Sequence, residues 1–473
     1  MLNNLFCTQN SKIDRKLYKV ISVVMYPMNP QKNIILITID CLRADHVGFM
    51  GYTHNTTPFL NTLAEEGIIF PAAFAVGPVT PVSFLSLMTS TYPLMYEGYT
   101  SISDERTTLA EVLAENGYDT AAFHSNPYLS RFYKYDRGFH TFYDNFELTH
   151  NNWQKIFKFF KKFNNFFKII KKTGITKKGV KQPHATAEHI NRNVISWMKT
   201  CSTPFFAWIH YMDVHAPYTP PSGYLTHPIG TGEKQQLFEK LVYRPSDISE
   251  DDLQKIINLY DAEIKYTDHA LQSLLTTIKD VLPDTVVIIT SDHGDEFAEH
   301  GGFLHGPRLY DELLHVPLLM WTPSGKKSVI ETPVSLLDVA PTILHIADIP
   351  VPSNFQGRNL LAIDEREEKG VFSEVSHKRE GKVTFHLGEK QIAYRTAEWK
   401  YIYRENGEDE LYNIKEDPLE QCNLREREQK IAEDLKLIIT CHMEMENALQ
   451  KSTSAEQEKI MEGITSLKLR DSL

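Results

Sequence analysis

One apolar segment that ends in a group of polar residues constrains the fold of this chain more than any other. Residues 285–291 read Thr-Val-Val-Ile-Ile-Thr-Ser, and Asp-His-Gly-Asp-Glu follows directly as residues 292–296. A run of β-branched residues bounded in this way is typical of a parallel strand buried on both faces. The carboxyl ends of such strands border the crevice where open α/β sheets bind ligands. Asp292 and His293 offer an oxygen and an imidazole nitrogen to a divalent cation. A strand followed by an ordinary polar turn is the alternative.

A second segment near the N-terminus repeats this design. Residues 33–39 read Asn-Ile-Ile-Leu-Ile-Thr-Ile and are followed by Asp40. If the two strands lie side by side, Asp40 and Asp292 meet at the same edge of the sheet. Two buried carboxylates without a cation would repel each other, and one would have to take up a proton. The pair therefore favours a metal site.

With these segments in view, the chain resembles the sulfatases and their relatives in the alkaline-phosphatase superfamily. Matching segments occur in family order across roughly residues 33–425. They are residues 37–46, 57–60, 86–89, 210–218, the stretch around Asp292, 315–318 and 410–418. Any one of these segments would be weak support, but the ordered set is specific.

Strands alternate with helices in the first part of the chain, and short strands cluster near its end. We expect strands at 68–75, 119–123 and 204–211, and helices at 57–66, 107–116, 185–199, 253–278 and 341–346. Residues 383–385, 391–394 and 400–403 alternate like strands of a small antiparallel sheet, and a helical pattern follows residue 425.

This order predicts an α/β fold with a large mixed, mostly parallel sheet flanked by helices, as in alkaline phosphatase. A smaller C-terminal α+β domain would carry the antiparallel sheet. The domains we expect are an N-terminal extension (1–32), a sulfatase-like catalytic domain (33–364) and a C-terminal subdomain with a terminal helix (365–473).

The resemblance assigns roles to six residues. It implies that Asp40, Asp292 and His293 bind a metal, that Thr80 is a metal-bound nucleophile, and that two histidines contact the transferred group or the leaving oxygen. These histidines are His215 and His305. Read from the residues alone, Thr80 precedes a helix start, where the helix dipole favours negative charge, and could equally be a simple cap. His215 and His305 could equally be ordinary loop residues.

The expected cofactor is one divalent ion, with Ca²⁺ or Mn²⁺ favoured and Zn²⁺ or Mg²⁺ as alternatives. Such an ion polarises an ester oxygen and lowers the pKa of a bound hydroxyl, so that Thr80 could form a covalent intermediate. Asp213 with His215 and His305 could hold a second ion, but we favour a single metal.

Two departures from the sulfatase pattern affect the expected substrate. Sulfatases carry a Cys or Ser that becomes formylglycine, whereas Thr80 cannot yield that aldehyde. Phe84 stands where an arginine would bind the anion, a role that His124 or Asn126 could partly take over. We therefore expect a hydrolase of sulfate or phosphate esters that favours phosphate esters, diesters in particular. A phosphotransferase that uses an acceptor hydroxyl, and a binding protein without catalysis, are the alternatives.

Composition limits the partners and the compartment. The net charge of −11 gives no reason to expect nucleic-acid binding, so the expected partner is a small-molecule, glycan or lipid-headgroup anionic ester. Five cysteines without CxxC spacing suit a reducing compartment, and the first thirty residues lack a convincing signal peptide. We expect a cytoplasmic protein without a membrane span.

The segment from residue 151 to residue 183 is a basic, aromatic insertion. Between Trp153 and Lys181 the chain has ten lysines, six phenylalanines and no acid. As a helix, its phenyl face could lie in an anionic membrane interface, which would attach the enzyme peripherally. The alternative is a lid that packs on the catalytic domain and leaves its lysines solvated.

Overall fold

The computed structural model describes most of the chain between residues 32 and 451. The described residues are 32–96, 98–99, 101–144, 184–323, 325–363, 369–377 and 389–451. Within these ranges, a search for a helix with the length and apolar character needed to cross a bilayer finds none. The predicted basic insertion at 151–183 and the extension at 1–31 lie outside the described residues.

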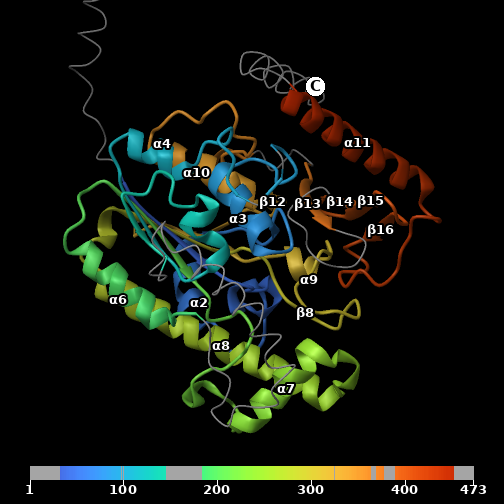
Figure 1. The fold of residues 1–473 in the computed structure, drawn as a ribbon, viewed down its shortest axis with the longest axis horizontal. Coiled ribbons are helices and arrows are strands. Elements are labelled where there is room, and N and C mark those ends of the chain that lie inside the picture. The colour runs from blue at the N-terminus through green and yellow to red at the C-terminus, as the bar shows by residue number, and fades with distance from the viewer. Residues whose placement is uncertain are drawn as a thin grey trace, which may run out of the picture.

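A large sheet of eight strands forms the centre of the molecule (Figure 1). Its strand order is β11-β2-β10-β7-β1-β6-β4-β5. In that order the strands span Ser328–Val329, Gly67–Ile69, Leu318–Trp321, Thr285–Ser291, Asn33–Ile39, Phe205–Tyr211, Asp119–Phe123 and Thr141–Tyr143. The five strands from β7 to β5 are parallel, and β10 is antiparallel to both of its neighbours. The mixed, mostly parallel sheet is as predicted.

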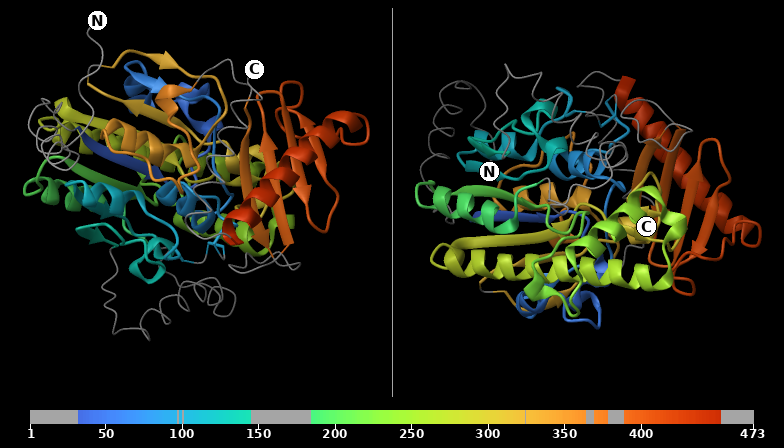
Figure 2. Two further views of the ribbon diagram at one scale, coloured as in Figure 1. Left: turned by 90° about the horizontal axis from the view of Figure 1, so that it is seen from above. Right: turned by 60° about the horizontal axis from the view of Figure 1, so that its bottom comes forward.

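Helices cover both faces of this sheet because its central strands are apolar on both sides. Along β1, Ile34 and Leu36 face one core, and Ile35 and Ile37 face the other. The first core packs α3, α4 and α10, and the second packs α2, α6 and α8, as the opposite layers of Figures 1 and 2 show. The six helices span Thr80–Thr89, Leu109–Glu115, Val339–Ile346, Pro58–Ala64, Ala187–Met198 and Glu250–Thr277, respectively. The helix α7 (Thr231–Tyr243) follows β6, and the short helix α9 (Asp311–Leu314) precedes β10.

The C-terminal part is an antiparallel sheet with one long helix across it. Strands β13 (Val371–His377), β14 (Glu389–Arg395), β15 (Trp399–Arg404) and β16 (Glu410–Asn413) pair in that order. The helix α11 (Gln429–Lys451) packs on one face of this sheet, and the other face belongs to the core around α3 and α10. The predicted α+β subdomain is therefore present, and its sheet is fused to the core of the larger part.

One sequence prediction needs correction, and one strand of the C-terminal sheet was not predicted. The strand expected over residues 68–75 is split, because Pro71 lacks an N–H for the ladder and the chain changes sheets there. Its first half is β2, and its second half is β3 (Ala73–Phe74), which pairs with β12 (Val334–Ser335) in a separate sheet. The strand expected at 383–385 lies outside the described residues, whereas β13, which the alternation did not predict, forms one edge of the C-terminal sheet.

Candidate active site

The two strand-end carboxylates meet at the centre of the large sheet. Strands β1 and β7 pair in parallel with Ile39 opposite Ser291, so Asp40 and Asp292 leave the sheet side by side. Both side chains are fully buried. The juxtaposition expected from the two apolar segments is therefore present.

Each carboxylate has a different set of partners. Asp40 Oδ1 accepts a hydrogen bond from the Cys41 thiol (3.0 Å), and Oδ2 accepts one from Asn126 Nδ2 (3.0 Å). His210 Nε2 lies 3.3 Å from Asp40 Oδ2. Asp292 Oδ1 accepts from the backbone N–H of Cys41 (3.3 Å) and of His293 (3.1 Å), whereas Oδ2 is buried without a hydrogen-bond partner.

The electrostatics of the pair fit a bound cation. Burial raises the pKa of Asp292, and the neighbouring charge of Asp40 raises it further. Burial acts in the same direction on Asp40, but His210 and His215 outweigh it and hold the pKa of Asp40 well below its usual range. Two buried acids, one with a free oxygen aimed into the site, are a donor set for a divalent ion rather than a stable pair by themselves.

His293 presents a nitrogen lone pair to Thr80. Its Nδ1 lies 2.9 Å from the carbonyl oxygen of Gly294, which can only accept, so Nδ1 carries the proton. Burial lowers the pKa of His293 to about 4, which keeps the ring neutral and leaves Nε2 unprotonated. Nε2 lies 3.2 Å from Thr80 Oγ1 and 3.4 Å from Asp292 Oδ2. Thr80, Asp292 and His293 thus converge, as the assigned roles require.

Thr80 is the first residue of α3, and Val79 is the N-cap. Thr80 is therefore not a cap itself. Its hydroxyl lies at the positive end of the α3 dipole, where developing negative charge is stabilised.

His305 forms a second group with Asp295 and His215. Its Nδ1 donates to Asp295 Oδ1 (2.8 Å), and Tyr218 donates its hydroxyl to Asp295 Oδ2 (2.6 Å). Burial by itself lowers the pKa of His305, but the hydrogen bond and the charge of Asp295 outweigh burial and raise it. Burial lowers the pKa of His215, whose ring centroid lies 5.3 Å from that of His305. Of the two histidines, His305 is the better proton donor.

The loop after β1 is held rigidly against β7. Cys41 has a positive φ of 60°, a conformation that costs a non-glycine residue about 1 kcal/mol or more. Its carbonyl accepts a hydrogen bond from Tyr260 (2.6 Å), and the Leu42 N–H donates to Ser291 Oγ (2.9 Å). Gly294 is required for close packing, since a Cβ there would lie 2.1 Å from the carbonyl oxygen of Glu312.

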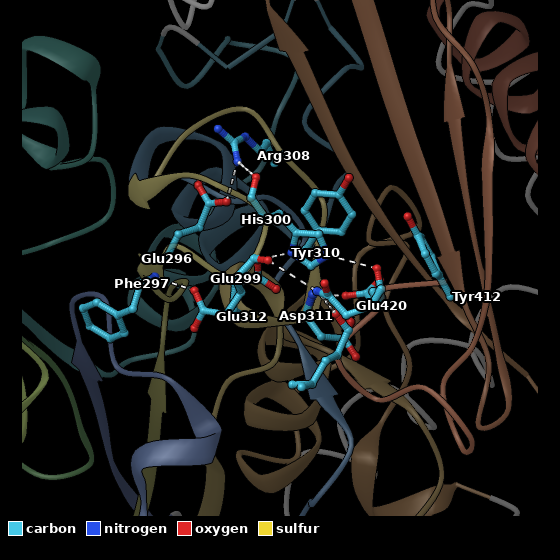
Figure 3. A network of polar contacts seen from close by, with 12 residues as sticks. Glu296, Phe297, Glu299, His300, Arg308, Tyr310, Asp311, Glu312, Tyr412 and Glu420 are labelled. Atoms are coloured by element: carbon cyan, nitrogen blue, oxygen red, sulfur yellow. Dashed lines mark hydrogen bonds and ion pairs between the residues drawn. The ribbon is translucent and has the colours of Figure 1, made fainter. Parts of the chain in front are cut away.

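A polar network supports the hairpin that carries His305 (Figure 3). The hairpin strands are β8 (Glu296–Phe297) and β9 (Phe303–Leu304). Between them, His300 donates to Glu312 (2.6 Å) and to the carbonyl oxygen of Glu420 (3.1 Å), so both ring nitrogens carry protons. Arg308 closes the hairpin through an ion pair with Glu296 (2.9 Å). The network ties the His305 segment to α9 and to the C-terminal part.

Other residues predicted near the site take different places. Asp213 lies beside the Ala187 backbone at the start of α6, and burial raises its pKa well above the usual range. Among the described residues, the group of possible ligands that contains His215 joins it to Cys41 and His305, not to Asp213. The alternative of a second ion held by Asp213 therefore gains no support.

Of the residues considered as replacements for the missing arginine, one lies in the site and the other does not. Phe84 is buried with its ring edge-on to His210, 4.8 Å between centroids. His124 is buried against Trp208, whereas Asn126 contacts Asp40 directly. Only Asn126 therefore reaches the site.

Two residues of the site, Cys41 and Asp295, were not predicted from the sequence. Cys41 lies with Asp40 and His293 in a group whose possible ligand atoms are all within 4.8 Å, and burial raises the pKa of its thiol well above the usual range. Asp295, which orients His305, was not assigned a role. Adjacency to Asp40 and to the Asp292 motif was the only sequence signal for either residue.

Comparison with known proteins identifies the family. A model described as Sulfatase matches residues 32–349, and one described as N-sulphoglucosamine sulphohydrolase, C-terminal, matches residues 298–450. Mouse arylsulfatase K is 24% identical over 448 residues, which cover 84% of this chain and 76% of the mouse protein. The Escherichia coli protein named uncharacterized sulfatase YidJ is 28% identical over 235 residues, so the chain spans about half of its length (47% of each).

Solved structures with the same fold include a phosphonate monoester hydrolase and a protein bound to a sulfated sugar. The phosphonate monoester hydrolase of Agrobacterium radiobacter superposes with a TM-score of 0.66 at 19% identity, covering 89% of this chain and 96% of that one. A protein in complex with its substrate D-glucosamine-2-N,6-O-disulfate gives the same TM-score and identity, with 91% and 98% coverage. The alkaline-phosphatase-like fold expected from sequence is confirmed. Since the Sulfatase model alone spans residues 32–349, well over half of the sequence, the chain belongs to the sulfatase family.

Proposed function

We propose that this chain is a metal-dependent ester hydrolase that uses Thr80 as its nucleophile and favours phosphate esters over sulfate esters. The observation that carries the proposal is the position of Thr80 Oγ1, 3.2 Å from the unprotonated Nε2 of His293 and at the N-terminus of α3. A buried hydroxyl in this setting can lose its proton and attack an electrophilic centre.

Thr80 would carry out the attack, and His305 with Asp295 would assist the departure of the leaving group. The Thr80 hydroxyl would release its proton to solvent, and its oxygen would form a bond to phosphorus while the ester P–O bond breaks, giving a Thr80 phosphoester. His305, protonated and oriented by Asp295, would give its proton to the departing alkoxide. Water would then cleave the Thr80 adduct and restore the hydroxyl, releasing phosphate from a monoester or the remaining phosphate monoester from a diester.

The site residues fit a divalent cation held by Asp40, Asp292 and His293 together with Thr80. Such an ion, with Ca²⁺ or Mn²⁺ favoured, supplies charge that lowers the pKa of the Thr80 hydroxyl and polarises the ester. The free Oδ2 of Asp292 and the lone pair of His293 support this assignment.

The preference for phosphate follows from the nucleophile. A threonine cannot become formylglycine, and Phe84 supplies no positive charge for a sulfate. The likeness in fold to phosphonate monoester hydrolases is compatible with phosphorus substrates, and the likeness to a structure bound to a sulfated sugar allows a glycan portion. We therefore propose an anionic ester of a small molecule, glycan or lipid headgroup as the substrate.

A matched substrate series tests the preference. We would compare kcat/KM for aryl sulfate, phosphate monoester, phosphate diester and phosphonate monoester with the same leaving group, with Ca²⁺, Mn²⁺, Zn²⁺ and Mg²⁺ each supplied in turn. We expect the phosphorus esters, diesters above all, to exceed the sulfate. A higher value for the sulfate would overturn the preference. A competing alcohol that captures the phosphoryl group would instead identify a phosphotransferase.

Substitution of Thr80 tests the nucleophile. Thr80→Ala should lose several orders of magnitude in kcat, and Thr80→Ser should keep part of the activity because a hydroxyl survives. Thr62→Ala, which removes an exposed hydroxyl from α2, is the control and should leave activity unchanged. Near-wild-type turnover by Thr80→Ala would show that a water molecule, not Thr80, is the attacking group.

A further inference from the structure

A second group of metal-ligand side chains lies away from the catalytic residues, between the C-terminal sheet and its helix. It consists of Glu374 on β13 and of His442 and Glu446 on α11, and we call it the β13–α11 cluster. Glu374 pairs with Ile392 across the sheet and so projects toward the face that α11 covers. His442 and Glu446 are four residues apart, one turn of the same helix face. None of the three takes part in the site around Asp40 and Thr80.

The spacing of the ligand atoms suits a small divalent ion. One oxygen or nitrogen from each residue lies within 4.8 Å of the other two. His442 Nε2 is 2.5 Å from Glu374 Oε1 and 3.8 Å from Glu446 Oε1. Ligands about 2.0–2.1 Å from a tetrahedral Zn²⁺ are roughly 3.3 Å apart, a value between these two distances. Small rotamer adjustments would place all three ligands around one ion.

Burial makes the cluster costly without a positive charge at its centre. Glu374, His442 and Glu446 are 0%, 3% and 6% exposed. Glu446 Oε1 is buried without a hydrogen-bond partner. Burial raises the pKa of Glu374 to about 7, and burial together with the charge of Glu374 raises the pKa of Glu446 to about 8.

The charged groups that face the two acids only partly offset the rise in their pKa values. The charges of Lys390 and Arg106 lower the pKa of Glu374, and those of His442 and Lys390 lower that of Glu446, yet both values remain raised. The acids must therefore share protons near neutral pH or share a cation.

The imidazole is held in a ligand-like orientation by its surroundings. Phe372 stacks on the His442 ring with centroids 4.0 Å apart and planes 10° apart, and Tyr92 meets it edge-on at 4.5 Å. The backbone N–H of Leu94 donates to Glu374 Oε2 (3.3 Å) and leaves Oε1 directed at the histidine. Such outer contacts fix the donors of metal sites before the ion binds.

We propose that Glu374, His442 and Glu446 bind a divalent cation of the Zn²⁺ class, which fastens α11 to the C-terminal sheet. One imidazole and two carboxylates are ligands of borderline ions, and three protein ligands leave one position for water. The helix packs through apolar contacts around Ile392 and Ile439 and through an ion pair of Lys436 with Asp409 (2.8 Å). The ion would add a further polar bridge at the Glu446 end of that interface. This is a structural role, separate from catalysis.

The experiment counts zinc in protein that lacks the catalytic metal ligands. Full-length Asp40→Asn/Asp292→Asn protein would be stripped with a chelator, reloaded with Zn²⁺ and dialysed, and its zinc would be measured by mass spectrometry. We expect one equivalent, lost when Glu446→Gln or His442→Gln is added. Glu444→Gln, a change of the same type at an exposed position of α11, is the control and should retain the zinc. Thermal unfolding of each variant with and without Zn²⁺ gives a second readout.

Each outcome decides the proposal. Zinc should raise the Tm of the double variant and of its Glu444→Gln derivative but not of its Glu446→Gln derivative. Absence of zinc from the stripped and reloaded double variant, or its retention after Glu446→Gln, would overturn the site. A Tm that rises on Glu446→Gln and ignores Zn²⁺ would show a proton-sharing acid pair instead. If His442→Gln does not fold, the zinc content of the isosteric Glu446→Gln variant still tests the site. Failure of the catalytic metal site would appear separately, as equal amounts of bound Ca²⁺ or Mn²⁺ in the wild type and in the Asp40→Asn/Asp292→Asn variant.

Discussion

Replacing Asp295 by asparagine should make His305, the proposed proton donor, harder to protonate without changing the shape of the site. Asp295 is fully buried, and its two oxygens accept hydrogen bonds from His305 Nδ1 and from the Tyr218 hydroxyl. A hydrogen bond to a charged group contributes about 1.5–3 kcal/mol, against about 0.5–1.5 kcal/mol for a neutral pair. Losing that difference, about 1–1.5 kcal/mol, should lower kcat/KM by about tenfold at pH values above the pKa of His305 in the wild type.

The pH profile gives the sign of this effect. Asp295 raises the pKa of His305, so the wild type keeps its acid protonated to higher pH and loses activity as pH rises through that pKa. In Asp295→Asn the pKa of His305 falls, so the alkaline limb of the kcat/KM profile should move to lower pH. Well below both pKa values the donor is protonated in both enzymes, and their activities should converge.

The assay is kcat/KM against pH with the best substrate of the matched series, since this ratio reports groups of the free enzyme. Tyr218→Phe is the matched control, because it removes the other hydrogen bond of Asp295 and keeps the carboxylate charge. Its alkaline limb should stay in place or move to higher pH, opposite to Asp295→Asn. An unmoved limb in Asp295→Asn would refute the assignment of His305 as the proton donor.

Three other perturbations test separate parts of the molecule. Asp292→Asn should lower metal content and activity together and raise the Tm of the metal-free protein, because it removes one of two buried acids that repel; unchanged metal content would exclude Asp292 as a ligand. Lys400→Met should cost about 3–5 kcal/mol in urea unfolding, because Lys400 is fully buried and its Nζ lies 2.7 Å from the carboxylate of Asp311 and 2.7 Å from the buried carboxylate of Glu420. Lys415→Met, at an exposed ion pair, should cost under about 1 kcal/mol, and equal losses would contradict the role of burial. We also propose that residues 153–172 attach the protein to membranes, so their deletion should abolish salt-sensitive sedimentation with anionic vesicles; equal, negligible sedimentation of the full chain with anionic and zwitterionic vesicles would favour a lid.

The main elements of the fold could be predicted because their signals are local. The continuous apolar runs before Asp40 and Asp292 correspond to β1 and β7, and the long periodic segment at 253–278 corresponds to α8 (Glu250–Thr277). A strand buried on both faces has a continuous apolar run, and a helix buried on one face has apolar residues at its own period. Both patterns can be read from residues that are close in the sequence. The split at Pro71 was missed because the hydrophobic pattern continues across it, although the proline cannot continue the ladder.

The candidate site could be predicted only in part. Two strands that each end in Asp predicted that Asp40 and Asp292 would meet, and their register in the structure agrees. The family resemblance, rather than the residues alone, singled out Thr80, and the structure places its hydroxyl beside His293. The role of Asp295 could not be derived, because it depends on a contact with His305 and is supported by one with Tyr218, 77 residues earlier in the chain.

By itself, the sequence determined which segments are strands or helices and which polar residues stand at their ends. Only the tertiary structure decided which of those residues meet. The order β4-β6-β1-β7 brings Asn126 to Asp40, and the packing of α11 brings His442 to Glu374, 68 residues away. The physical reason is that backbone conformation follows local propensity and periodicity. The protonation and pairing of buried side chains, by contrast, follow from neighbours that only the packed core brings together.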